Sequence, residues 1–218
     1  TPPTPTHGDG PALKRYLTSW DAIGDLATER HDDLGLTGKW AALVPSIPEG
    51  KNYLWHTPEG GGVPLFGWRT KFWSFLLKLA KNRPSWTIQA SPGPATGPFH
   101  WSNRQLSTRE LCRLQTIPDE YVIAGGRRAV QRQIGNAVPC ALAEVLGLEI
   151  RSQLLRDTNL PTGASLIPER SKRTRRAHTV ARVPVEYDHL RGEHKPHGGT
   201  GKGPSARKRT PVLRQRPA

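Results

Sequence analysis

Residues 104–119 read RQLSTRELCRLQTIPD and residues 131–139 read QRQIGNAVP, and these two phrases dominate the middle of the chain. The first contains a capping box, because the Ser107 hydroxyl can accept a hydrogen bond from a first-turn amide while Glu110 reaches back to the Ser107 amide. Pro118 then ends the predicted helix. In the second phrase, Gly135 predicts a tight backbone bend, and Pro139 suits the first turn of another helix.

Positive charge is concentrated at the carboxyl end. The 218 residues carry 32 Lys and Arg against 18 Asp and Glu, a net charge of +14. From Glu169 onward the count is 14 against 4, so +10 lies there and 14 − 10 = +4 in residues 1–168. Such a surplus favours salt-dependent attraction to DNA or RNA. A solvated, disordered tail is compatible with the same composition, which buries too little apolar surface to offset ordering entropy.

Other classes of site find little support. Cys112 and Cys140 are the two cysteines, and no Cys or His spacing suggests a metal site, so no metal is expected. No apolar run reaches membrane-spanning length and no signal peptide is present, which predicts a cytoplasmic location and no membrane partner. The chain contains no methionine, which favours the carboxyl-terminal piece of a longer protein or a separately processed part.

Further elements are predicted in the first half. Thr18 can cap a short helix that ends near Arg30. The apolar spacing of TKFWSFLLKLAKN, residues 70–82, predicts a second helix, and residues 86–90 have strand character. Residues 34–64 combine turns with tryptophan, which is typical of a surface that grips a ligand. The basic side chains around the second helix, which would meet phosphates or solvent, are Arg69, Lys71, Lys78, Lys81 and Arg83.

Together the two phrases resemble blocks IX and X of the DNA cytosine-5 methyltransferases. The resemblance covers roughly residues 1–155, most strongly from Pro84 onward, where PSWTIQASPGPATGPFHW is similar to the approach to block IX in one bacterial subgroup. It implies an α/β fold: the carboxyl-terminal portion of a Rossmann-like S-adenosylmethionine-dependent methyltransferase, with a small irregular α+β target-recognition domain and a disordered basic tail. The expected parts are a connector (1–15), a target-recognition region (16–97), the block IX and X part (98–156) and the tail (157–218).

The resemblance also implies roles for particular residues. Asn136 and Ala137 would contact S-adenosylmethionine, since the corresponding positions of block X do so in the family. Arg109 would brace the recognition domain against the catalytic domain, because a guanidinium can hold several carbonyls or a phosphate; Arg113 and Gln115 are weaker candidates. The full set expected to brace the domains or contact DNA is Arg109, Arg113, Arg69 and Lys71.

No residue of the chain is expected to be catalytic. The pair Pro139-Cys140 looks like the family's Pro-Cys nucleophile, but it falls in the block X helix and lacks the polar surroundings that activate a thiol. Cys112 lies on the block IX helix between Leu111 and Arg113. The family's glycine-rich cofactor loop, Pro-Cys-Gln loop, Glu-Asn-Val and Gln-x-Arg-x-Arg motifs are not found, so the chain is expected to be inactive alone.

The predicted function is therefore that of a part or subunit of a bacterial, nucleoid-associated DNA cytosine-5 methyltransferase, with a restriction-modification system as its expected setting. It would bind double-stranded DNA and share S-adenosylmethionine with a missing amino-terminal segment or a polypeptide carrying blocks I to VIII. Without the sheet that these earlier blocks would supply, Leu142, Val145 and Leu146 would be exposed. The alternatives are a non-catalytic DNA-binding or regulatory remnant of such an enzyme, and an RNA- or ribosome-associated protein, which block X argues against.

Overall fold

A computed structural model describes residues 1–29, 33–69, 71–161, 163–169, 171 and 173–196. Helices in this part of the chain are joined by long irregular segments, and the backbone pairs only at isolated bridges rather than in a β-ladder. The α-helices are α1 (Ser19–Ile23), α2 (Thr108–Leu114), α3 (Arg127–Asn136) and α4 (Cys140–Leu155). The 3-10 helices are η1 (Asp25–Thr28), η2 (Ala41–Ser46), η3 (Tyr53–His56) and η4 (Val185–Leu190).

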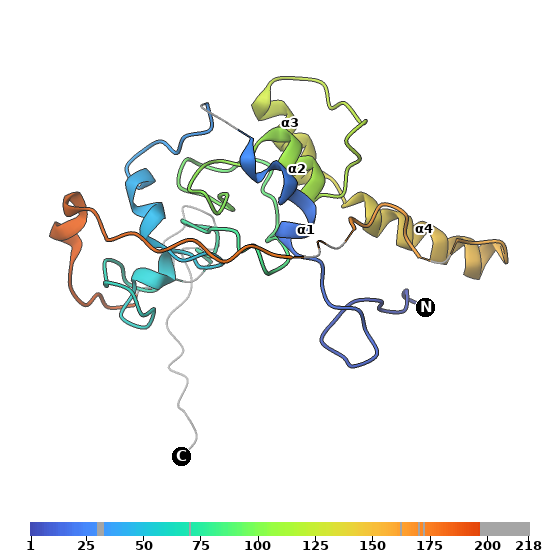
Figure 1. Cartoon of the computed structure of the whole chain (residues 1–218), viewed down its shortest axis with the longest axis horizontal. Coiled ribbons are helices and arrows are strands. Elements are labelled where there is room, and N and C mark those ends of the chain that lie inside the picture. The colour runs from blue at the N-terminus through green and yellow to red at the C-terminus, as the bar shows by residue number, and fades with distance from the viewer. Residues whose placement is uncertain (30–32, 70, 162, 170, 172, 197–218) are drawn as a thin grey trace, which may run out of the picture.

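Two hydrophobic clusters hold these elements together. The first lies where α1, α2 and α3 meet, and it includes Ile23, Trp101 and Ile134. The second is built from η2, η3 and the loops around them, and it includes Leu43 and Tyr53. Figure 1 shows α4 projecting away from α1, α2 and α3.

The capping box at Thr18 is confirmed. The Thr18 hydroxyl accepts from the Asp21 amide at 3.3 Å, and the Asp21 carboxylate accepts from the Thr18 amide at 2.8 Å. The α-helix is shorter than expected, however, because it ends at Ile23 and continues as the 3-10 helix η1. The expected end near Arg30 lies outside the described residues.

The predicted helix over residues 70–82 is wrong. Residues 71–82 form turns and single bridges, from Phe75 to Thr96 and from Lys78 to Phe99, and Leu76 adopts a positive φ of 53°; position 70 lies outside the described residues. Burial runs without interruption over residues 76–81, so this segment is covered on more than the one side that an amphipathic helix would bury. The apolar spacing satisfied the helical pattern only by coincidence. Residues 86–90 likewise lie in irregular structure and form no ladder.

The lysines of the same segment were also misplaced by the helical interpretation. Lys78 and Lys81 are buried rather than on a solvated face. The Lys78 ammonium donates to the Ile47 carbonyl at 2.5 Å, and burial lowers the pKa of Lys78 to about 8. The Lys81 ammonium pairs with the Glu49 carboxylate at 2.5 Å. Both groups therefore hold the fold together and are not available to phosphates.

The helix of the first phrase is confirmed, but the role of Gly135 in the second differs from the prediction. Gly135 lies within α3 and makes no bend. A Cβ at this position would lie 2.3 Å from the Ala90 nitrogen and 2.5 Å from the Gln89 carbonyl carbon. Glycine is needed here because it lets α3 approach the backbone of residues 89–90.

Helix α4 leaves much of its apolar surface uncovered. Leu142, Leu146 and Ile150 are 50%, 43% and 55% exposed, while Val145 is half-buried. The exposure expected of Leu142 and Leu146 is therefore observed. The Rossmann-like sheet against which such a helix would pack is not present among the described residues.

The tail is more ordered than its composition predicts. Residues 173–196, here called the C-terminal strap, run back from the α4 side across both clusters and include η4 (Figure 1). Tyr187 is only 3% exposed; its ring stacks on Trp40 at 5.7 Å, and its hydroxyl donates to the Lys39 carbonyl at 2.8 Å. A few apolar anchors therefore offset the entropy cost that the overall composition implied. Residues 197–218 lie outside the described residues.

Candidate functional site

The two sequence phrases meet through Gln115, at the end of α2. Its side-chain amide donates to the Ile134 carbonyl at 2.9 Å and to the Ala137 carbonyl at 3.2 Å. The backbone carbonyl of Gln115 accepts from the Cys140 amide at 3.0 Å, and the Thr116 hydroxyl accepts from the Ala141 amide at 2.8 Å. The end of α2 thus clamps the turn between α3 and α4 on both sides.

Asn136 and Ala137 lie in that clamped turn. Asn136 is the last residue of α3, and both residues are exposed. No other side chain in the described part of the chain hydrogen-bonds to the Asn136 amide. Val138, next in the chain, is 58% exposed. Gln115 therefore fixes the backbone of the turn, while the Asn136 side-chain amide and the Ala137 methyl group remain available to a ligand. The amide offers a hydrogen-bond donor and an acceptor, which fit one edge of a polar cofactor.

A largely buried cluster of polar and charged side chains, Glu110, Arg104 and His100, stabilises the start of α2. Glu110 is fully buried, and its carboxylate accepts from the Arg104 guanidinium at 2.7 and 2.6 Å and from the Ser107 amide at 2.7 Å. Burial alone would raise the pKa of Glu110, but these hydrogen bonds outweigh it and hold the pKa below its usual value. Glu110 is thus a cap and an ion-pair partner, in keeping with the capping box. The sequence pattern did not single out Arg104, although its charge lies only six residues before Glu110.

Neutral His100 completes this cluster. Its Nε2 lies 3.5 Å from a Glu110 carboxylate oxygen and has no hydrogen-bond partner in the described structure. Its Nδ1 accepts from the Ser102 amide at 3.1 Å. Burial lowers the pKa of His100 to about 3, so the ring is uncharged at neutral pH.

Arg109 and Arg113 both use their guanidinium groups on carboxylates. Arg113 binds both oxygens of Asp25 at 2.7 and 2.6 Å and also Asp119 at 2.8 and 2.5 Å. Arg109 reaches Asp119 at 2.9 Å and Glu29 at 3.4 Å. Hydrogen bonds from Arg113 and Arg109 hold the pKa of Asp119 well below its usual range. The two arginines thereby link α2 to η1 and to the turn after α2; contact with DNA stays a prediction.

Arg69 and Lys71 belong to another surface. The Arg69 backbone is held by the Tyr53 hydroxyl, which donates to its carbonyl at 3.0 Å and accepts from its amide at 2.9 Å. The Arg69 guanidinium lies 5.6 Å from the Phe72 ring, and Lys71 is exposed. Trp73 nearby is 50% exposed. Basic and aromatic side chains that alternate on a surface are typical of nucleic-acid contacts.

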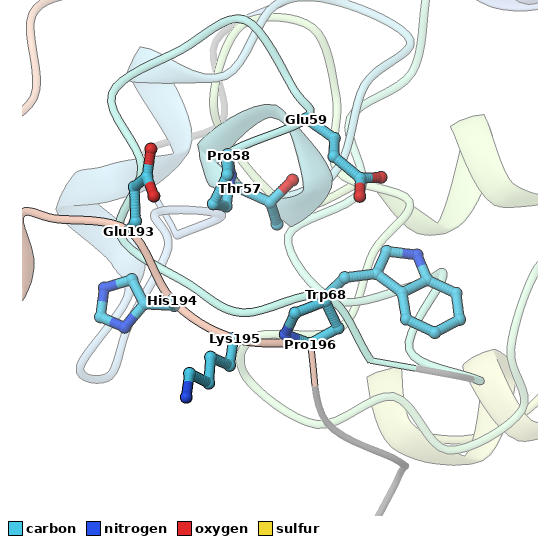
Figure 2. A pocket seen from close by; sticks show the side chains of 8 residues that line it. All are labelled: Thr57, Pro58, Glu59, Trp68, Glu193, His194, Lys195 and Pro196. Atoms are coloured by element: carbon cyan, nitrogen blue, oxygen red, sulfur yellow. The ribbon is translucent and has the colours of Figure 1, made fainter. Parts of the chain in front are cut away.

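A pocket of about 360 Å³ lies beside this surface (Figure 2). Residues that follow η3 form one wall, the end of the C-terminal strap forms another, and Trp68 also lines the pocket. The residues that line it are Thr57, Pro58, Glu59, Trp68, Glu193, His194, Lys195 and Pro196. The strap therefore contributes to the surface around the second cluster and not only to its core.

Among the described residues, no helix is long and apolar enough to cross a membrane. The same residues contain no group of three or more His, Cys, Asp or Glu side chains placed to hold a metal ion.

Comparison with known proteins identifies relatives of the chain. The model of the family "C-5 cytosine-specific DNA methylase" matches residues 67–152. Type II methyltransferase M.SacI of Streptomyces achromogenes is 45% identical over 141 residues, which cover 58% of this chain and 36% of that protein. M.NgoFVII of Neisseria gonorrhoeae is 32% identical over 142 residues, or 63% and 37% of the two chains. M.BbvI of Brevibacillus brevis is 30% identical over 147 residues, or 66% and 38%.

These matches confirm the resemblance inferred from the two phrases. The chain spans about a third of the length of the curated relatives it matches. The family match ends at residue 152, so the C-terminal strap lies beyond it.

Proposed function

We propose that this chain, whose residues 67–152 match the model of the C-5 cytosine-specific DNA methylase family, supplies DNA target recognition and part of the S-adenosylmethionine site of a DNA cytosine-5 methyltransferase. The observation that carries this proposal is the Gln115 clamp. It joins the helix of the first phrase to the turn of the second and leaves Asn136 and Ala137 exposed. That arrangement suits a joint between a recognition module and a cofactor-binding domain.

Bound S-adenosylmethionine supplies the methyl group for C5 of cytosine. The part of this chain in that site is to bind and orient. The Asn136 amide offers a donor and an acceptor at the end of α3, and the small side chain of Ala137 leaves room for close approach. Gln115 fixes both positions through the Ile134 and Ala137 carbonyls.

The nucleophile that attacks the flipped cytosine lies in sequence other than these 218 residues, in the same polypeptide or in a partner. Cys112 is half-buried, and burial raises the pKa of its thiol. A raised pKa reduces the thiolate fraction and so disfavours attack. Cys140 begins α4, and its amide is held by the Gln115 carbonyl. Both cysteines serve packing in this proposal.

The exposed apolar face of α4 suits docking onto the part that carries the earlier sequence blocks. Leu142, Leu146 and Ile150 are each about half exposed and lie at helical spacing on one stripe. Arg69 and Lys71, beside exposed aromatics, suit contact with duplex DNA. The assembled enzyme would act on chromosomal DNA in the bacterial cytoplasm, within a type II restriction-modification system.

Reconstitution tests this proposal. The purified chain is assayed for transfer of a labelled methyl group to duplex DNA, alone and mixed with the part of M.SacI that lies outside the matched region. We expect no transfer by the chain alone and transfer by the mixture. Methyl transfer by the chain alone would refute an external nucleophile. Failure of a mixture in which both proteins are folded and bind DNA would support a non-catalytic DNA-binding remnant instead.

A further inference from the structure

The C-terminal strap is fixed to the recognition region at several points along its backbone. The Arg176 carbonyl accepts from the Lys81 ammonium at 3.1 Å, and the His178 amide donates to Glu49 at 2.9 Å. The Ala181 amide donates to the Pro45 carbonyl at 3.1 Å. Together with buried Tyr187, these contacts hold residues 176–187 against both clusters.

The first half of the strap carries a run of uncompensated positive charge. Its arginines are Arg173, Arg175, Arg176 and Arg182, and all four are exposed. No acidic residue occurs between positions 173 and 185. No ion pair joins these guanidinium groups to a carboxylate of the described residues.

The nearest carboxylates along the strap are already engaged. Glu49 is 6% exposed and is bound by the Lys81 ammonium. Asp21 accepts from the Thr18 amide in its capping box and from the Ser171 amide at 2.8 Å. The surplus charge of the strap therefore faces solvent at fixed positions instead of being neutralised within the fold.

We propose that the strap forms a second DNA-contacting edge of the recognition module, where Arg173, Arg176 and Arg182 bind phosphates of the duplex on which the module reads its target. This inference rests on the proposed function, since it requires the module to bind double-stranded DNA. Guanidinium groups match phosphate geometry and bind it through paired hydrogen bonds. Arg175 is set apart, because its guanidinium lies 5.8 Å from the Trp20 ring and packs on the fold.

Because its backbone is already fixed, the strap should lose less conformational entropy on binding DNA than a disordered tail would. A disordered segment loses conformational entropy when it binds, whereas the strap is ordered already by Tyr187 and its hydrogen bonds. Phosphate contacts carry no base information, so they add affinity and register without changing the preferred sequence. The strap would thus strengthen binding to target and non-target DNA alike.

The salt dependence of binding by the full chain tests this inference. Duplex affinity is measured from low to moderate salt for the wild type and for the triple variant Arg173→Gln, Arg176→Gln, Arg182→Gln. Each phosphate contact contributes about 0.9 to the slope of log affinity against log salt, so the variant should lose roughly 2–3 units of slope. The loss of affinity should be the same for all sequences. A matched control, Arg15→Gln, Arg151→Gln, Arg156→Gln, removes equal charge from the amino-terminal segment, from α4 and from its C-cap, and it should lose much less slope.

The outcomes distinguish a failure of the strap inference from a failure of the proposed function on which it rests. If the wild type binds DNA with a sequence preference but the strap variant keeps the full slope, the strap inference is wrong and the proposed function stands. Equal losses in the strap variant and the control would also overturn it, because general charge would then explain the effect. A wild type that binds no duplex DNA, or binds double-stranded RNA more tightly, would overturn both. Thermal unfolding of each variant confirms that folding is retained.

Discussion

Replacing Gly135 with alanine should separate α3 from the segment it packs on. A Cβ at this position would lie 2.3 Å from the Ala90 nitrogen and 2.4 Å from the Ala90 Cα. Ordinary contacts of this kind begin near 3.4 Å, so α3 and residues 89–90 must move apart by about 1 Å. The neighbours are backbone atoms, which cannot rotate out of the way.

The expected cost follows from three contributions. Overpacking against a fixed backbone costs about 1–3 kcal/mol. Separation also weakens the hydrogen bond from the Gln131 side chain to the Gln89 carbonyl, now 2.6 Å long, at about 1 kcal/mol. Alanine returns at most about 1 kcal/mol of helix propensity so close to the end of α3. The net loss should be roughly 2–3 kcal/mol, or about 5–10 °C in melting temperature for a chain of this size.

Thermal and urea unfolding measure this loss, and Gly147→Ala provides the matched control. Gly147 also lies in a helix, but a Cβ there would meet nothing within 4 Å. The control should be neutral or stabilised by up to about 1 kcal/mol. If Gly135→Ala were as stable as Gly147→Ala, the close approach of α3 to residues 89–90 would not exist, and the stated reason for glycine in the second phrase would be wrong.

Three further predictions concern buried and thiol groups. Glu110→Ala should lower the free energy of unfolding by about 3–5 kcal/mol, because it leaves the Arg104 guanidinium without its carboxylate. Glu149→Ala, on exposed α4, should cost far less. Urea titration of the two variants measures both losses. The free energy of unfolding should fall as pH drops below 6.5. In the unfolded chain His100 binds a proton in this range, whereas in the folded chain its pKa of about 3 keeps it neutral. The loss attributable to this ring is about 2 kcal/mol between pH 6.5 and pH 5, and His100→Asn should remove it; an unchanged slope in that variant would contradict the assignment. Cys140→Ser combined with Cys112→Ser should leave methyl transfer by the reconstituted enzyme within about twofold of wild type, and complete loss of transfer with retained folding would place the nucleophile in this chain.

Local hydrogen-bond chemistry was the part of the fold that could be predicted from sequence. The capping boxes at Thr18 and Ser107 depend on residues three positions apart, so their partners are visible in the chain itself. The position of Gly135 was recognised but its reason was not. Its neighbours, Gln89 and Ala90, lie more than forty positions away, and nothing in the spacing indicates them.

Burial and long-range anchors limited the rest. The segment at 70–82 has the spacing of a helix, yet Leu76, Leu77 and Leu79 are all buried because other segments cover both of its sides. The strap looks disordered by composition, but Tyr187 finds a tertiary partner in Trp40. For the candidate site, the family resemblance pointed to Asn136 and Ala137 as cofactor contacts, which stays a prediction, and it named Gln115 only as a weaker candidate for bracing. The clamp depends on two carbonyls about twenty residues away.

The central claim, that this chain selects the DNA target of a cytosine-5 methyltransferase, is tested most directly by mapping methylated sites in two chimeras. This chain replaces the matched region in M.SacI and, separately, in M.BbvI, and 5-methylcytosine is mapped across a genome at single-base resolution. We predict that both chimeras methylate one common sequence pattern, set by this chain. If each chimera instead keeps the pattern of its parent enzyme, the chain does not determine the target, and the account is contradicted.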